Sequence, residues 1–164
     1  MKQIDVSTSK HPNRFALVDD YDYKKLSRIN WYAAESTNNL YACRNITVDG
    51  VQKILRMHTV LLGWAANEMC DHRNGITLDN QRHNLRHCSS LENSRNRKVT
   101  SRSKSGYKGV SWHKNARKWR VTISYGGKQR SQGLFHCVVS AAKHYDNLAK
   151  KHFGEFARLN FPET

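Results

Sequence analysis

Residues 70–96, CDHRNGITLDNQRHNLRHCSSLENSRN, are the stretch that decides the fold of the first half of the chain. Asp71 and His72 stand side by side at the end of an apolar stretch, directly before an Asn74-Gly75 pair that favours a turn. Neighbouring residues of a strand point to opposite faces, but a twist at the strand end can bring both side chains to one cleft. The pattern predicts a strand whose last two residues are Asp71, which carries a carboxylate, and His72, which carries an imidazole.

The second half of this stretch predicts a return strand and a helix. Residues 84–88 have the composition of a short strand, and Ser89 with Glu92 three residues later forms the signature of a capped helix start. Asn93 then lies in the first helical turn, near the positive end of the helix, which favours a bound phosphate. Two strands and a helix are therefore expected to surround one small polar site.

The residue types in this site are those of metal-assisted hydrolysis. A carboxylate such as that of Asp71 is a hard oxygen ligand for magnesium or manganese, and the amide oxygen of Asn93 suits the same cation. A neutral imidazole such as that of His72 can take a proton from water. The segment thus predicts a metal ligand beside a general base.

These residues resemble the His-Asn-His endonucleases with a ββα-metal (His-Me finger) core, in particular the phage and intron-borne homing endonucleases. The resemblance rests on four blocks in order: Asp71-His72-x-Asn74-Gly75, Leu78-x-Asn80, Asn84-Leu85-Arg86 and Glu92-Asn93. It implies that His72 is the general base, that Asn84 orients its imidazole, and that Asp71 and Asn93 bind Mg²⁺, for which Mn²⁺ can substitute. The implied activity is site-specific hydrolysis of DNA phosphodiester bonds, by nicking or by double-strand cleavage.

Other interpretations of the same residues stay open. His83 and His87 are alternative bases, although neither has an adjacent carboxylate. His58 and Asn80 are expected to have structural roles, and Asp71 or Asn93 taken singly could be a turn cap or a solvated helix residue. A zinc site of Cys70, His72 and Cys88 is the minor alternative to buried free thiols.

The region before this core is expected to be rich in β-structure. Residues 14–19 predict a strand and 21–28 a short helix whose Leu26 faces inward beside Trp31. Residues 40–48 and 51–57 flank Asp49-Gly50, a dipeptide that favours a two-residue hairpin turn, so they predict a β-hairpin.

The charge of the chain points to a polyanionic partner. With 28 Lys and Arg against 13 Asp and Glu, the formal net charge of the 164 residues is +15. No apolar run has the length of a membrane span, and the first residues lack the apolar core of a secretory signal. We expect double-stranded DNA as the partner, no membrane, and an intracellular protein that is phage- or intron-encoded and acts in the host cytoplasm. The sequence indicates no protein partner and leaves a homodimer open.

A basic connection separates two modules. Residues 94–105 carry five basic side chains and almost no apolar ones, so they predict an extended segment rather than a core. It is interpreted as a strap along DNA phosphates, with a solvated linker as the alternative. The predicted division is an N-terminal β-rich region and nuclease core over 1–97, with the core at about 57–97, a basic linker over 98–105 and a DNA-binding domain over 106–164.

The second module predicts a three-stranded antiparallel sheet packed on one helix. Strands are expected near 107–112, 118–125 and 128–135, with Gly126-Gly127 as a turn. A helix is expected over 138–152, because its apolar residues recur at helical spacing and Gly154 stands where a C-terminal cap belongs. The fold class of the whole chain is therefore α+β.

This module resembles the plant ethylene-response-factor DNA-binding domain, which also occurs attached to His-Asn-His homing endonucleases. The matching blocks are Gly106-Tyr107-Lys108-Gly109-Val110, Lys118-Trp119, Gly133-x-Phe135, Ala141-Ala142-x-x-Tyr145-Asp146 and Leu159-Asn160-Phe161-Pro162. The resemblance implies that the sheet lies in the major groove. For Trp112, a place in the hairpin core is the alternative to DNA contact, and a non-catalytic DNA-binding regulator is the alternative function of the whole chain. The residues predicted to contact DNA are Arg95, Arg97, Lys98, Arg102, Lys104, Lys108, Trp112, Lys118, Arg120, Thr122 and Arg130.

Overall fold

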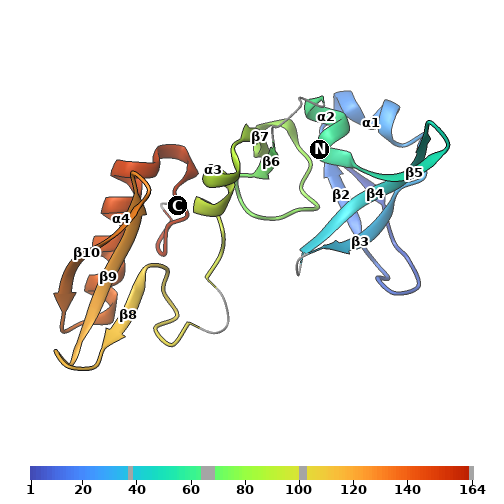
Figure 1. Ribbon diagram of the computed structural model, residues 1–164. Coiled ribbons are helices and arrows are strands. Elements are labelled where there is room, and N and C mark those ends of the chain that lie inside the picture. Colours follow the sequence, from blue (N-terminus) through green and yellow to red (C-terminus); the bar gives the residue numbers. More distant parts are fainter. Residues whose placement is uncertain (37–38, 64–68, 100–102, 163–164) are drawn as a thin grey trace. The chain divides into compact units, whose positions relative to one another are not determined.

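The computed structural model describes residues 1–36, 39–63, 69–99 and 103–162, and it divides the chain into two compact units, Met1–Ser90 and Leu91–Thr164. Each unit is described by itself (Figure 1). The described residues form a mixed α and β structure of small antiparallel sheets and four α-helices. This confirms the mixed α and β content that the sequence predicts.

The first unit begins with a two-stranded hairpin and a short helix, β1 (Lys2–Asp5), β2 (Phe15–Val18) and α1 (Asp20–Leu26). Leu26 is buried at the end of α1, and its carbonyl accepts a hydrogen bond of 2.9 Å from the indole Nε1 of Trp31. The predicted strand, the predicted helix and the inward position of Leu26 beside Trp31 are confirmed.

A second antiparallel sheet follows, in the order β3-β4-β5, from β3 (Tyr32–Ser36), β4 (Asn39–Val48) and β5 (Val51–Arg56). Asp49 and Gly50 have φ angles of 52° and 75°, and Val48 pairs with Val51 across the turn. Positive φ at both central residues is the geometry of a turn that matches the twist of a hairpin, so the predicted hairpin is confirmed.

Helix α2 (Met57–Leu62) follows β5 directly and packs into the core of the first unit. Met57 is fully buried and Leu61 is 8% exposed, and they join a cluster that includes Val6, Val18 and Leu26. His58 of the same helix also faces inward. Because the apolar side chains anchor the helix, they also fix the position of His58.

The last sheet of this unit is the hairpin of β6 (Met69–His72) and β7 (Leu85–Cys88), joined by a long loop that contains the short 3-10 helix η1 (Arg82–Asn84). The N-terminal hairpin holds this loop in place. The amide of Leu17 donates to the carbonyl of Leu78, and the amide of Asn80 donates to the carbonyl of Leu17, both at 2.8 Å. Buried Asp22 of α1 also accepts two hydrogen bonds from the guanidinium of Arg82. The N-terminal extension is therefore a structural support of the predicted nuclease segment.

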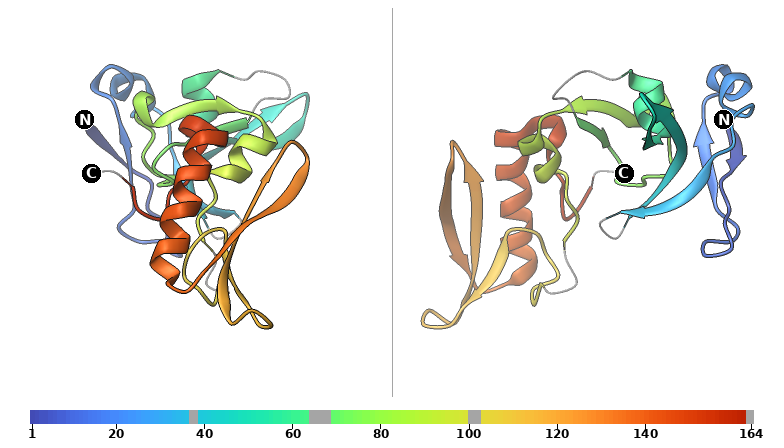
Figure 2. Two further views of the ribbon diagram at one scale, coloured as in Figure 1. Left: turned by 90° about the vertical axis from the view of Figure 1, so that its left-hand side faces the viewer. Right: turned by 45° about the vertical axis from the view of Figure 1, so that its right-hand side comes forward.

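The second unit contains the sheet β10-β9-β8 and the longest described helix. Figure 2 shows this helix lying along one face of the sheet. The bounds are β8 (Val110–His113), β9 (Lys118–Tyr125), β10 (Lys128–Phe135), α4 (Val138–Phe153) and the short 3-10 helix η2 (Gly154–Phe156). The predicted second and third strands have these same bounds, the predicted helix ends one residue earlier than α4, and the first strand is shorter than expected.

The core of this unit lies between the sheet and α4. Val121 and Ile123 of β9 pack with Ala142 and Tyr145 of the helix. Gly109 is required at its position, because a Cβ atom built there would lie 2.0 Å from the Tyr145 ring and its φ is 72°. The predicted sheet covered by one helix is therefore confirmed.

The boundary between the compact units lies after Ser90, the first residue of helix α3 (Ser90–Arg95), whereas the sequence predicts a domain end after this helix, at residue 97. The difference has a physical cause. The guanidinium of Arg95 lies 4.7 Å from the ring centroid of Phe153, and the Lys108 ammonium donates to the carbonyls of Arg95 and Arg97. The helix therefore has strong contacts with the second unit, and the division into functional modules stays a prediction.

Candidate active site

Strand β6 ends on the two residues that the sequence singles out. Asp71 is 6% exposed and His72 is 4% exposed, so both polar side chains are buried. In the hairpin register, Asp71 stands opposite Arg86 and His72 opposite Leu85. The two side chains have different neighbours, although Asp71 still favours the charged form of the imidazole electrostatically.

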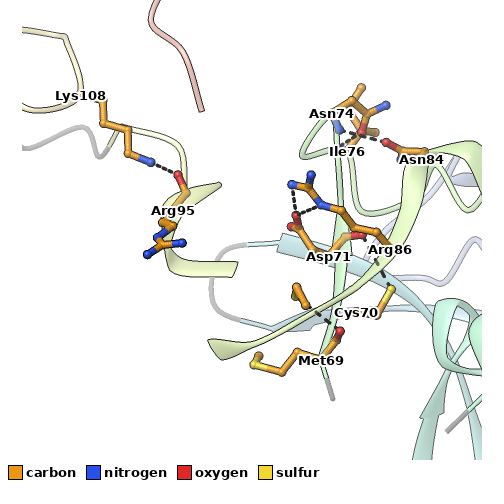
Figure 3. A network of polar contacts seen from close by, with 10 residues as sticks. Met69, Cys70, Asp71, Asn74, Ile76, Asn84, Arg86, Arg95 and Lys108 are labelled. Atoms are coloured by element: carbon orange, nitrogen blue, oxygen red, sulfur yellow. Dashed lines mark hydrogen bonds and ion pairs between the residues drawn. The ribbon is translucent and has the colours of Figure 1, made fainter. Parts of the chain in front are cut away.

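Asp71 forms a buried ion pair with Arg86 (Figure 3). Its Oδ2 atom accepts hydrogen bonds from Arg86 Nε at 2.9 Å and from Nη2 at 2.6 Å, and the two side chains are 7% and 6% exposed. The sequence analysis gave Arg86 no role in the site. The available signal was a charged residue in a short, otherwise buried strand, which needs a partner of opposite charge.

His72 is surrounded by aromatic rings and amides. Its ring centroid lies 5.1 Å from that of His58 and 6.3 Å from that of Tyr41. Burial lowers the pKa of His72, and this effect outweighs the influence of the Asn80 side chain and of the charges of Asp71 and Asp79, which act in the opposite direction. The imidazole is therefore neutral at neutral pH, as a general base requires.

Asn84 holds the loop between the strands rather than the imidazole. Its Oδ1 accepts from the amide of Asn74 at 2.9 Å, and its Nδ2 donates to the carbonyl of Asp79 at 2.7 Å. It is 2% exposed. The sequence predicts that Asn84 orients His72, but its side-chain hydrogen bonds go to the loop; Asn80, interpreted from the sequence as a loop residue, is the asparagine whose side chain favours the charged form of His72.

The loop itself is closed by an amide and a carboxylate. Asn74 donates from Nδ2 to Asp79 Oδ2 at 2.8 Å. It also accepts from the amide of Ile76 at 2.8 Å (Figure 3). Together with the bonds of Asn84, these contacts fix the chain immediately after His72. The Asn74-Gly75 turn predicted from the sequence is present, with Gly75 at φ 69°.

The predicted metal ligands stand in different compact units. Asp71 belongs to the first unit, whereas Asn93 lies in α3 and belongs to the second. Among the described residues, no three His, Cys, Asp or Glu side chains converge on a possible metal position. The predicted pair uses one carboxylate and one amide, so it is not a cluster of that kind and stays a prediction.

The register of the second unit separates the predicted DNA contacts into two faces. Lys118, Arg120 and Thr122 alternate with the apolar residues of β9, so they share the face that α4 does not cover. Arg130 pairs with Ile123 and therefore points to the other side, where its guanidinium lies 4.8 Å from the ring centroid of Tyr125. The two-residue Gly126-Gly127 turn sets the register of the two strands. Counting residues from this turn could therefore have predicted the face on which Arg130 lies.

Trp112 also lies on the side of α4. It pairs with Trp119, and the two indole rings are 5.0 Å apart in an edge-to-face arrangement. Its side chain is 46% exposed. Of the two interpretations left open by the sequence, this pairing favours a packing role in the hairpin over a contact with DNA.

Lys108 has a partner within the second unit. Its ammonium donates to the carbonyl of Arg95 (Figure 3) and to that of Arg97. Burial lowers the pKa of Lys108 to about 8. The predicted phosphate contact would need this side chain to leave those carbonyls. Lys98 and Lys104 are exposed, as is the side chain of Arg97, whereas Arg102 lies outside the described residues.

The fold and the site define a mixed α and β protein with small antiparallel sheets and a buried histidine at a strand end. The chain is similar to Protein 3.8 of Escherichia phage T7, with 40% identity over 92 residues that cover 54% of this chain and 73% of the phage protein. It belongs to the same family as that phage protein, whose name states no activity. No family model and no solved structure matches the chain. No described helix combines the length and the apolar character that crossing a membrane requires.

Proposed function

We propose that the protein is a site-specific, metal-dependent DNA endonuclease of the His-Asn-His homing type, with a ββα-metal core. The observation that carries the proposal is the pair at the end of β6: His72, a buried imidazole with a lowered pKa, directly follows Asp71, a buried carboxylate, in the chain. A structural histidine has no need of a neighbouring carboxylate, whereas hydrolysis of a phosphodiester uses a neutral base and a negatively charged ligand.

His72 accepts the proton of the attacking water in this proposal. Because burial keeps the imidazole neutral, its lone pair is available at physiological pH. The water then attacks phosphorus in line with the departing 3′ oxygen, which leaves 5′-phosphate and 3′-hydroxyl ends. The rigid loop bonds of Asn74 and Asn84 keep the strand end, and with it the base, in one place.

Asp71 and Asn93 would hold the divalent cation, Mg²⁺ or Mn²⁺. The fit is chemical: both side chains offer hard oxygen atoms, and the Arg86 guanidinium holds the carboxylate of Asp71 in a fixed place. Such a cation, when bound, stabilises negative charge that develops on the phosphate. With only two protein ligands, the affinity for the cation is expected to be low until DNA is present.

The second unit would supply most of the DNA affinity. The chain has a net charge of +15, and Lys118, Arg120 and Thr122 lie on the sheet face opposite α4. In this proposal the basic side chains neutralise phosphates, and Arg120 reads a base edge. We also propose that the protein is phage-encoded and acts in the host cytoplasm, since its relative is a phage protein.

The test is cleavage of supercoiled plasmid by the wild-type chain. We expect nicked or linear product with Mg²⁺ and with Mn²⁺, none with chelator, and new ends that a ligase joins without prior phosphorylation. Equal cleavage with chelator would contradict the metal requirement. Ends that a ligase cannot join would contradict the proposed direction of bond breakage.

A non-catalytic DNA-binding regulator is the second candidate. The ion pair of Asp71 with Arg86 favours it, because this carboxylate already has a charged partner without any cation. The same preparation distinguishes the two candidates. A chain that shifts duplex DNA in a gel but leaves every plasmid intact under all metal conditions is a regulator.

A further inference from the structure

Three aromatic rings from three different elements meet at the predicted base. Tyr41 comes from β4, His58 from α2 and His72 from β6. The His58 and His72 rings are 5.1 Å apart with their planes at 79°, and the Tyr41 and His58 rings are 5.6 Å apart at 72°. These are edge-to-face contacts, the arrangement that aromatic pairs prefer.

The position of His58 is determined by its surroundings. Its side chain is 4% exposed, and the neighbouring Met57 and Leu61 anchor α2 in the apolar core. On the other side of the cluster, the guanidinium of Arg56 lies 4.6 Å from the Tyr41 ring centroid and donates to Ser36 Oγ at 3.2 Å. The rings therefore cannot shift without disturbing the core or these polar contacts.

The imidazole of a general base must present one nitrogen to the water in a fixed direction. Asn84, the residue that the sequence suggests for this task, uses its side chain to bind Asn74 and the carbonyl of Asp79. The task therefore falls to the groups around the imidazole, which include the Asn80 side chain and, at 5.1 Å between centroids, the ring of His58. We propose that His58, supported by Tyr41, is a positioning residue that fixes the ring plane of His72.

This inference rests on the proposed endonuclease function, and it concerns the flat ring of His58 rather than its charge. Burial, His72 and Arg56 together lower the pKa of His58 to about 3, so at neutral pH the two imidazoles do not repel each other. A neutral ring of similar shape should therefore replace His58, whereas an aliphatic side chain of similar bulk should not.

The test compares His58→Phe with His58→Leu in the full chain. Both replacements are apolar and fill the buried site, but only phenylalanine restores a flat ring. We expect His58→Phe to keep kcat within about threefold of wild type and His58→Leu to lower kcat by about 10- to 100-fold, with KM unchanged in both, because misplacing a catalytic group by about 1 Å has effects of this size. Equal kcat values for the two variants would overturn the proposal.

Leu61→Ala is the matched control for stability. It removes a buried side chain from the same helix, but it leaves the His72 contacts intact, so kcat should stay at the wild-type value at temperatures well below its lower Tm. A kcat loss in Leu61→Ala as large as that in His58→Leu would show that helix packing alone is responsible and would overturn the positioning role.

Histidine side-chain NMR gives a readout that needs no cleavage. The ring protons of His72 should give one sharp set of signals in the wild type and in His58→Phe, and broadened or shifted signals in His58→Leu. If the wild type cleaves no DNA but shows this pattern, the proposed function fails and the positioning contact stands. Identical His72 signals in the three proteins would overturn the inference whatever the activity.

Discussion

The two compact units bury their polar groups in different ways. Among the described residues, ten polar or charged side chains are buried, and all but Asn96 and Asp146 belong to the first unit. Burying such groups is unfavourable unless they are paired, so the first unit must satisfy each of them in a dense network. The second unit instead keeps an apolar core and leaves most of its basic side chains at the surface.

This difference separates chemistry from binding. A buried polar network can shift the pKa of an imidazole and hold it rigidly, as the surroundings of His72 do. An exposed basic face cannot do this, but it can attract a polyanion and release counterions. We therefore expect substitutions in the first unit to change stability and chemistry, and substitutions on the sheet face of the second to change DNA affinity.

The largest stability effect should come from Arg86→Met. It leaves the buried carboxylate of Asp71 without its guanidinium partner, and breaking a buried ion pair in this way costs about 3 to 5 kcal/mol of unfolding free energy. Urea denaturation measures the change. Lys118→Met is the control on the second unit, where a surface substitution should change stability by less than about 0.5 kcal/mol. Equal, small losses in both variants would remove the distinction between the units.

The next effect is the loss of stability in acid. The pKa of His58 is about 3 in the folded chain and 6.5 for an ordinary histidine, so the unfolded state binds the proton more readily. The stabilisation is therefore complete above pH 6.5 and is lost as the pH falls toward 3, amounting to about 2 to 3 kcal/mol between pH 6.5 and 4.5. In urea titrations the wild type should lose stability relative to His58→Phe as the pH falls, and a difference between the two proteins that does not change with pH would contradict this.

The C-terminal sheet was predictable because its signals are local. The alternation of apolar and polar residues over 118–125 and the Gly126-Gly127 turn lie within one hairpin, and the observed strands have the predicted bounds. The same holds for the Asp49-Gly50 hairpin. In both cases the turn residues and the alternation of the strands predict the same hairpin, so the prediction does not depend on a contact between residues distant in sequence.

The contacts of the candidate site could not be predicted in this way. The pairing of Asp71 with Arg86 depends on a register set across a long loop, and the contact of His58 with His72 depends on how α2 packs. The attachment of α3 to the second unit depends on Lys108 and Phe153, which are distant in sequence. Local patterns identified the residue types of the site, but tertiary packing decides which of them touch.

On the sheet face of the second unit, substitutions of Arg120 and Lys118 should affect DNA binding in different ways. If Arg120 reads a base edge, Arg120→Ala should reduce discrimination between sites by about 1 to 3 kcal/mol. Lys118→Ala should weaken binding to all sequences alike and lower the slope of affinity against salt by about one unit. Binding measured on a panel of duplexes at several salt concentrations would show both effects. Two variants with the same profile would contradict a division into base and phosphate contacts.

The smallest effect is expected at Arg130. Its guanidinium stacks on Tyr125, on the side of the sheet where Ile123 packs, so it is not on the proposed DNA-binding face. We expect Arg130→Gln to retain the site preference of the wild type and to change the salt slope by less than one unit. A loss of discrimination as large as that of Arg120→Ala would place Arg130 at the DNA after all.

The central claim, that His72 is the base of a DNA-cleaving site, is tested most directly by the single-turnover cleavage rate of His72→Ala with saturating DNA and Mg²⁺. His83→Ala is the matched control, since His83 is an exposed histidine in η1 and the alternative base suggested by the sequence. General-base catalysis contributes about 10²- to 10⁴-fold, so His72→Ala should lose at least this much rate while its DNA affinity in a gel shift is unchanged, and His83→Ala should cleave like the wild type. A His72→Ala chain that cleaves at the wild-type rate would contradict the account.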